Sequence, residues 1–215
     1  NYEVIFSNKN VVPAIFNSIF ITGIGTLINM ILTMLAAYVL TRPNLVGKKI
    51  LMGFFIVMML FDPGIVPEYM VIRQLGLMGT KWSVILSQAC NVYYLVIMMR
   101  YFESVPKSLC EAATIDGATA MQQRMKIAIP MLAPSITINF ITTSISAFKA
   151  YELPYNISQG QPNKTTLLMT QRIYFFGFQD YDYGLGSALS VFLLLIIAAI
   201  SLIQLIYLKK KEDIY

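Results

Sequence analysis

Histidine is absent from this 215-residue chain, and charged residues make up only 13% of it. Without histidine, the chain cannot use an imidazole as a general base or as a zinc ligand. An ordinary soluble domain is about a quarter charged, so this composition is not that of a soluble domain. Hydrophobic residues account for 57% of the chain, which is typical of a protein that crosses a membrane several times.

Cysteines are also scarce, and the chain contains no sequence motif for binding a nucleotide. Cys90 lies within an apolar stretch and Cys110 in a polar one, so we expect neither a disulfide framework nor a metal site. No segment matches the P-loop pattern G-x-x-x-x-G-K-[ST], and no nucleophile is paired with a base. The chain by itself is therefore predicted not to be an enzyme and to hold no cofactor. The sequence starts at Asn1 and not at Met, so we expect the real N-terminus of the protein to lie further upstream.

Five apolar stretches predict an all-α bundle of transmembrane helices. A span needs about 20 apolar residues, so the first stretch is long enough to tilt or to begin with an interfacial turn. Asp62-Pro63-Gly64 is expected to end the second stretch, and residues 149–186 form the longest loop. The five stretches are residues 12–40, 50–61, 82–99, 131–148 and 187–208.

The distribution of Lys and Arg predicts the orientation of these spans. The segments that contain residues 41–49, 100–130 and 209–215 together carry ten basic and five acidic residues. The segments on the other side carry six of each. Since basic residues gather on the cytoplasmic side, we expect the N-terminus outside and the C-terminus inside.

A polar segment between the third and fourth spans has the pattern of two short helices. Pro106 favours a helix start, and Ser108-x-x-Glu111 reads as a capping box. Gly117 is suited to stop the helix, because glycine adopts positive φ without a Cβ penalty. A second short helix is predicted over residues 119–128, ending at Pro130.

The same segment resembles the cytoplasmic motif of importer-type ABC permeases. That motif is Glu-Ala-Ala, three residues, Gly, nine residues and Ile-x-Leu-Pro, and residues 111–118 are most similar to the maltose and multiple-sugar branch. Ile129 stands where the family usually has Leu, a near-isosteric difference. The alternative is an ordinary amphipathic loop between helices. The positions that carry the resemblance are Glu111, Ala112, Ala113, Gly117, Ile127, Ile129 and Pro130.

This resemblance implies partners, localisation and roles for the residues of the motif. The chain would form one permease domain, residues 1–215, in a bacterial-type cell membrane, with a further span upstream. It would pair with a homologous permease, two ATPase subunits that bind ATP and Mg, and an extracytoplasmic solute-binding protein. Helices at about 104–129 would dock on the ATPase, and Asp116 would either cap its helix or pair with that subunit. The implied docking residues are Glu111, Ala112, Ala113, Asp116, Gly117, Ile127 and Pro130.

Polar stripes on the spans suggest a path for an uncharged solute. One stripe comprises Thr22, Thr26, Asn29 and Thr33; the others are Ser83-Ser87-Asn91-Tyr94 and Ser135-Asn139-Thr142-Ser146. Such residues either join packed helices by hydrogen bonds or line a pore. The spans lack charge, which argues against an ion or polyamine path. A sugar offers many hydroxyls and no charge, so the candidates for contact with it are Asn91, Tyr94, Asn139 and Phe148.

The functional prediction is a permease subunit that imports a carbohydrate. Residues 160–166 resemble an outer loop of one of the two paired sugar permeases, whereas residues 65–77 resemble the other, so which member this is stays open. One alternative is the same architecture with another solute, such as a phosphate ester or a peptide. A second alternative is a channel or a membrane-embedded enzyme that works without an ATPase.

Overall fold

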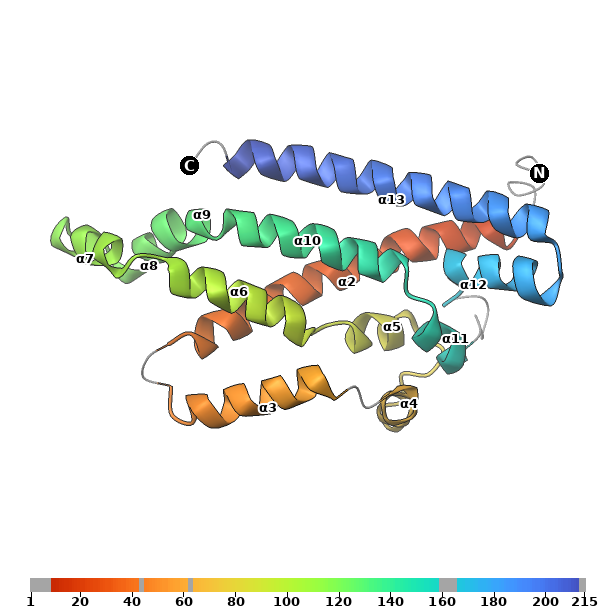
Figure 1. The fold of residues 1–215 in the computed structure, drawn as a ribbon, viewed down its shortest axis with the longest axis horizontal. Helices are drawn as coiled ribbons and strands as arrows, with labels where there is room; N and C mark the ends of the chain where they lie inside the picture. Colours follow the sequence, from red (N-terminus) through yellow and green to blue (C-terminus); the bar gives the residue numbers. More distant parts are fainter. Residues whose placement is uncertain (1–8, 43–44, 62–63, 159–165, 213–215) are drawn as a thin grey trace. The chain divides into compact units, whose positions relative to one another are not determined.

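The computed structural model describes residues 9–42, 45–61, 64–158 and 166–212, and all the regular structure in these ranges is helical (Figure 1). The all-α prediction is confirmed. The elements are α2 (Val11–Leu40), α3 (Lys48–Leu60), α4 (Ile65–Gln74), α5 (Lys81–Ser87), α6 (Val92–Ser104), α7 (Lys107–Ile115), α8 (Ala120–Gln123), the π-helix η1 (Arg124–Ala128), α9 (Ile129–Met131), α10 (Ala133–Phe148), α11 (Glu152–Ser158), α12 (Met169–Tyr174), the π-helix η2 (Phe175–Gln179) and α13 (Tyr183–Glu212).

Two of these helices, α2 and α13, are each long and apolar enough to cross a membrane. Three bent pairs have the length and composition of one further span each: α3 with α4, α5 with α6, and residues Met121–Met131 with α10. Counted in this way, the described residues offer up to five spans, the number expected from the sequence.

The third predicted span is not one helix, because a new helix begins at Asn91. This residue is extended (φ −121°, ψ 123°), and its side chain accepts a hydrogen bond of 2.9 Å from the Tyr93 N–H. Asparagine at an N-cap satisfies a backbone donor that the helix itself leaves unpaired. The prediction that Ser83, Ser87, Asn91 and Tyr94 share one helical face is therefore wrong, since the helical phase is interrupted.

The break after the second predicted span is confirmed. Helix α3 ends at Leu60 with Phe61 as its C-cap, and α4 follows Gly64, whose φ is +77°. A positive φ of this size is accessible to glycine without steric penalty. Asp62 and Pro63, which were predicted to contribute to the break, lie outside the described residues.

The chain forms two compact units, each assembled from three separate segments. Unit 1 comprises Asn1–Ile28, Pro63–Ala89 and Thr143–Ser201, and unit 2 comprises Asn29–Asp62, Cys90–Thr142 and Leu202–Tyr215. The prediction of one domain over residues 1–215 stays a prediction.

Unit 1 is built around the first half of α2, α12 and α13. Two hydrogen bonds tie α2 to the segment before α12: Asn17 Nδ2 donates to the Leu167 carbonyl (3.2 Å), and Ser18 Oγ accepts from the Met169 N–H (3.1 Å). These polar groups are buried and hydrogen-bonded, so they fix where α2 contacts this segment within an otherwise apolar core. The core side chains are Val11, Ala14, Phe148, Leu167, Met169, Phe176, Ala188, Leu189 and Leu193.

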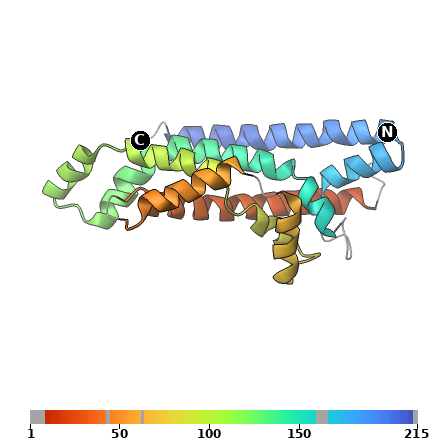
Figure 2. The same cartoon turned by 60° about the horizontal axis from the view of Figure 1, so that its bottom comes forward.

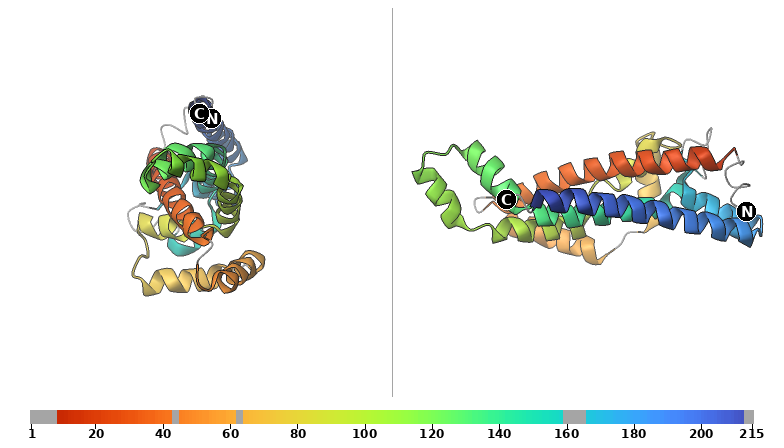
Figure 3. Two further views of the ribbon diagram at one scale, coloured as in Figure 1. Left: turned by 90° about the vertical axis from the view of Figure 1, so that its left-hand side faces the viewer. Right: turned by 90° about the horizontal axis from the view of Figure 1, so that it is seen from above.

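The start of α13 lies beside α12 and η2, and a glycine sets that approach (Figure 3). A Cβ built on Gly186 would lie 3.1 Å from both Cα and N of Gly177. Tyr181, at φ 55°, forms the turn that ends η2, and Asp182 then accepts a hydrogen bond from the Leu185 N–H (3.0 Å) at the start of α13. The glycine contact and this turn together fix how α13 begins.

Unit 2 packs α6 against the second half of α2, with α3 and α10 at its sides. The buried core is Met30, Ala37, Leu40, Leu95, Met98 and Met99. Helix α3 contributes partly buried side chains to this core but has no fully buried residue, and Ile50, Phe54 and Leu60 are exposed. Exposed apolar side chains of this size along a whole helix are expected where lipid or another helix covers it.

Candidate docking hairpin and polar helix faces

The polar segment between α6 and α10 folds as a hairpin of two arms, α7 and α8–η1 (Figure 2). The N-cap of α7 is Pro106, with φ −64° and ψ 126°. Ser108 therefore lies inside the helix, and the capping box predicted for Ser108 and Glu111 is wrong. The helix starts two residues earlier than that pattern implies, because Pro106 already has the φ that a helix needs and lacks an N–H to satisfy.

The first arm ends in a Schellman motif centred on Gly117. The Gly117 N–H donates to the Thr114 carbonyl (3.1 Å), and the Ala118 N–H donates to the Ala113 carbonyl (2.9 Å). Gly117 has φ +79°, the left-handed conformation that this motif requires and that glycine adopts most readily. The predicted helix stop at Gly117 is confirmed.

A capping box opens the second arm, and the sequence analysis missed it. The Thr119 N–H donates to Gln122 Oε1 (2.8 Å), and Thr119 Oγ1 accepts from the Gln122 N–H (3.3 Å). Thr-x-x-Gln is a recognised form of this motif, so the pattern was present in the sequence. The predicted second helix is confirmed and continues through η1 and α9 to Met131.

The two arms are joined by the side chain of Gln123. Its Nε2 donates to Thr114 Oγ1 (2.9 Å), on the first arm, and to the Ala118 carbonyl (3.1 Å), in the turn. Sequence reasoning did not find this residue either, because nothing in a single glutamine indicates where its amide points.

The tip of the hairpin presents charged and apolar groups to the surroundings. Ile115 is 87% exposed, and Glu111 and Asp116 are exposed as well. The ion pair recorded among the side chains that the structure describes is Arg100 with Glu103 at 3.4 Å, and it involves neither of these carboxylates. Asp116 is the C-cap of α7 through its backbone N–H, which donates to the Ala112 carbonyl. An apolar tip beside exposed carboxylates is suited to a partner that carries basic groups.

Two cavities flank the hairpin, and the residues that line them include the second part of the motif, Ile127 and Pro130. One, of about 420 Å³, is lined by Asp116, Gly117, Ala118, Gln122, Gln123, Lys126 and Ile127. The other, of about 320 Å³, is lined by Leu109, Lys126, Ile127, Pro130, Met131, Ala133 and Pro134. The structure thus brings Ile127 and Pro130 onto the hairpin that carries the Glu-Ala-Ala residues.

A sharp bend separates the hairpin from α10. Residues Met121–Met131 and α10 meet at 61°. Pro130 and Pro134 each lack the N–H that would continue the helical ladder, and a proline ring clashes with the carbonyl four residues before it. The π-helix η1 lies directly before Pro130, and prolines and π-bulges are the usual causes of such kinks.

The predicted solute contacts fall into different environments. In unit 2, Asn139 is fully buried, and its Nδ2 donates to the Tyr94 carbonyl (3.3 Å), which joins α10 to α6. Its Oδ1 has no donor among the described residues. Asn91 caps α6, as described above. Phe148 is 4% exposed within the core of unit 1, so its ring faces other apolar side chains.

The other polar stripes are largely buried between helices. On α2, the stripe Thr22, Thr26, Asn29 and Thr33 is buried throughout, and the Thr33 hydroxyl donates to Asn29 Oδ1 (3.3 Å). On α10, Ser135 is buried and donates to the Met98 sulfur (3.4 Å). The Ser135 contact joins α10 to α6, as helix-joining residues do, whereas the Thr33 bond lies within α2. Only the far end of the α10 stripe, at Ser146, is exposed.

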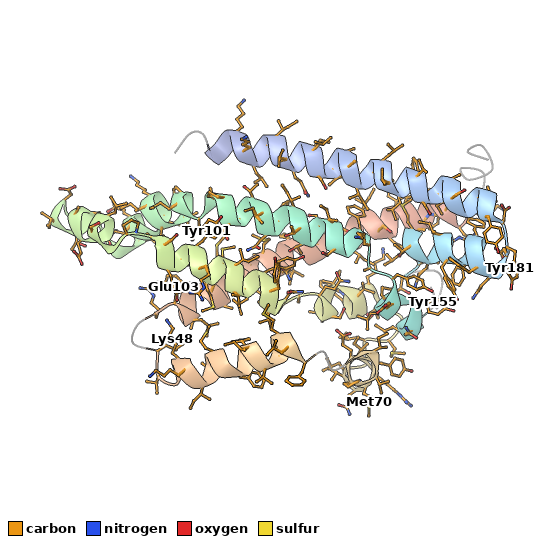
Figure 4. The ribbon with its side chains drawn as sticks, viewed as in Figure 1. Lys48, Met70, Tyr101, Glu103, Tyr155 and Tyr181 are labelled. Atoms are coloured by element: carbon orange, nitrogen blue, oxygen red, sulfur yellow. The ribbon has the colours of Figure 1, made fainter. Side chains whose placement is uncertain are left out.

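An aromatic cluster in unit 1 was not singled out in the sequence. Tyr151 and Tyr155, which is labelled in Figure 4, stack with ring centroids 5.3 Å apart, and each lies 5.2 Å from Tyr174. Burial and the neighbouring phenols raise the pKa of Tyr151 to about 12. Arg172 lies over the Phe176 ring at 4.4 Å, and burial lowers the pKa of its guanidinium. Composition alone could not show that these rings, from α12, α11 and the residue before α11, meet.

Residues 14–212 match the family described as binding-protein-dependent transport system inner membrane component. The chain belongs to this family. The resemblance seen in the hairpin motif is therefore confirmed.

Relatives within the family are named as permeases. The chain is 35% identical over 150 residues to the polygalacturonan/rhamnogalacturonan transport system permease protein YtcP of Bacillus subtilis, covering 70% of this chain and 52% of YtcP. It is 36% identical over 135 residues to the probable starch degradation products transport system permease protein AmyD of Thermoanaerobacterium thermosulfurigenes, covering 63% of this chain and 44% of AmyD. The chain thus spans about half the length of these relatives. The sn-glycerol-3-phosphate transport system permease protein UgpA of Pectobacterium atrosepticum is 24% identical over 239 residues, covering 99% and 80%.

Solved structures of ABC importers share the fold. A bacterial ABC transporter involved in the import of the acidic polysaccharide alginate matches with a TM-score of 0.75 at 24% identity, covering 100% of this chain and 78% of that chain. The MetNI methionine ABC transporter, in an inward-facing conformation, matches with a TM-score of 0.68 at 14% identity, covering 93% and 95%. The permease fold expected from the sequence is confirmed.

Proposed function

We propose that this chain is the membrane-spanning permease subunit of an ATP-driven ABC importer that takes up a carbohydrate. The observation that carries the proposal is the hairpin of α7 and α8–η1. It exposes Glu111 and Ile115 at a tip held by the Gly117 turn, and it runs directly into α10 through Pro130. A channel or enzyme without an ATPase would have no use for such an exposed hairpin tip.

The partners proposed are those that such a hairpin serves. Two cytoplasmic ATPase subunits would bind ATP and Mg, and the hairpin would dock in a cleft on one of them, with Glu111 facing a basic group. A homologous permease would complete the membrane part as a heterodimer, and an extracytoplasmic binding protein would deliver the solute. The excess of basic residues near the hairpin supports its placement on the cytoplasmic side.

Carbohydrate is the solute that the relatives favour. The two relatives with identities of 35% and 36% are named for polygalacturonan/rhamnogalacturonan and for starch degradation products. The predicted path offers neutral groups such as Asn139, and a sugar needs hydrogen bonds without a counter-charge. A phosphate ester is the second candidate, because the relative that covers 99% of this chain is named for sn-glycerol-3-phosphate.

The test is a charge reversal in the complete reconstituted transporter. Glu111→Lys places a like charge against the basic partner, so solute-stimulated ATP hydrolysis and uptake should both be lost while the permease still inserts. Glu103→Lys is the matched control, because its exposed pair with Arg100 is of a kind that contributes little. Full stimulation and full uptake in Glu111→Lys would overturn the proposal. A comparison of the uptake of labelled oligosaccharides with the uptake of labelled glycerol phosphate decides between the two solutes.

A further inference from the structure

We infer that Gln123 is a positioning residue that sets the relative placement of the two arms of the docking hairpin, and so determines how efficiently ATP hydrolysis is coupled to transport. This inference rests on the proposed function. A primary amide has two N–H donors, and Gln123 directs its Nε2 to two acceptors, Thr114 Oγ1 at 2.9 Å and the Ala118 carbonyl at 3.1 Å.

The other hydrogen bonds of the hairpin described above stay within one turn. The Schellman bonds connect Ala113 and Thr114 to the two residues after the C-cap Asp116, and the capping box lies within Thr119–Gln122. They define how each arm ends or begins. The bond from Gln123 to Thr114 spans nine residues, from one arm to the other, and therefore fixes the angle at which the arms leave the turn.

The placement of the arms matters because they have different functions. The first arm carries Glu111 and Ile115, which would meet the ATPase, whereas the second arm continues through η1 and α9 into α10. A displacement of the first arm reaches α10 only if the second arm moves with it. When the arms can hinge about Gly117, the ATPase gains no differential contact with the two states of the permease, and such a ligand shifts no equilibrium.

Gln123 occupies an exposed hairpin, so its loss should loosen the arms without unfolding them. The variants are Gln123→Leu, which removes both bonds, and Thr114→Val, which removes the acceptor on the first arm at nearly constant shape. Gln74→Leu, at an exposed glutamine of α4, controls for the loss of a surface amide. All are made in the full importer, purified with its partners.

Two readouts are measured for each variant. Pulsed EPR between labels at Ser108→Cys and Met125→Cys, one on each arm, reports the distribution of distances once Cys90 and Cys110 have been replaced by serine. Uptake per ATP hydrolysed reports coupling. We expect Gln123→Leu to broaden the distance distribution and to lower the coupling ratio roughly fivefold, the equilibrium effect of losing the one net hydrogen bond that joins the two arms. Gln74→Leu should change neither readout.

The double variant tests whether Gln123 acts through Thr114. Residues that share one interaction are non-additive, so Gln123→Leu with Thr114→Val should be no worse than Gln123→Leu alone. A narrow distance distribution in Gln123→Leu overturns the inference, and so does a broad distribution with full coupling. In both cases Glu111→Lys, measured in the same assay, shows whether the proposed function stands. Loss of transport in Glu111→Lys supports the proposed function, and normal transport in Glu111→Lys contradicts it.

Discussion

The Gly117 turn allows a prediction whose size follows from its geometry. At φ +79°, a Cβ added to Gly117 would meet nothing within 4 Å, so a substitution there meets no steric obstacle from the rest of the chain. What remains is the conformational cost of placing an L-residue in the left-handed region, about 1–2 kcal/mol. This conformational cost is smaller for asparagine, which adopts the left-handed region routinely, and larger for a β-branched residue.

These differences predict an order of function for three variants. An equilibrium constant changes about tenfold for each 1.4 kcal/mol, so Gly117→Ala should lower the equilibrium constant for forming the correctly turned hairpin about tenfold. Gly117→Asn should remain close to the parent, and Gly117→Val should be the most impaired. Solute-stimulated ATP hydrolysis and uptake should fall in that order, while membrane insertion stays unchanged.

Hydrogen exchange at the Ala118 amide provides an independent measurement. This N–H donates to the Ala113 carbonyl within the Schellman motif, so its protection should fall in the same order as transport. Equal protection and equal transport in the parent and Gly117→Val would refute the reasoning. The reasoning would also be refuted if Gly117→Asn were as impaired as Gly117→Val. Position 117 would then need to lack a side chain where it meets the partner, and positive φ would not be the reason for glycine.

Two further predictions concern the spans and their packing. Asn139→Leu should lower uptake while leaving assembly of the complex intact. The reason is that the variant removes a buried Oδ1 that has no donor among the described residues. Normal uptake with a less stable complex would mean that Asn139 only joins α10 to α6. Gly186→Ala should destabilise the protein by about 1–3 kcal/mol in thermal unfolding, since its Cβ would press on the Gly177 backbone at 3.1 Å. Gly177→Ala, whose Cβ meets nothing within 4 Å, is the matched control and should unfold within a degree or two of the parent.

The sequence predicted the hairpin well because its determinants are local. A glycine stop at residue 117 and a helix resuming after it depend on backbone preferences that act over a few residues. The capping box predicted at Ser108 was wrong because Pro106 is the N-cap of the first arm. The equally good pattern Thr119-x-x-Gln122, at the start of the second arm, was overlooked. Local patterns name the candidates, and the backbone around them selects one.

Long-range arrangement was harder to predict. The break at Asn91 was missed because an apolar run on both sides of a polar residue reads as one span, whereas the asparagine side chain competes for the backbone N–H of Tyr93. Phe148 was expected beside the polar path, but tertiary packing places it in the core of unit 1. Its burial depends on partners more than twenty residues away, such as Met169 and Leu189, which no periodicity reveals.

The bend between Met131 and α10 has a mechanical consequence. Since the two segments meet at 61°, a push delivered along the axis of the second arm acts on α10 more across its length than along it. Motion of the hairpin toward the membrane would therefore tilt α10 instead of sliding it. Tilting changes the spacing between helices at one end of a bundle more than at the other. A kink at two prolines would thus turn a linear stroke of the hairpin into a one-sided opening of the bundle.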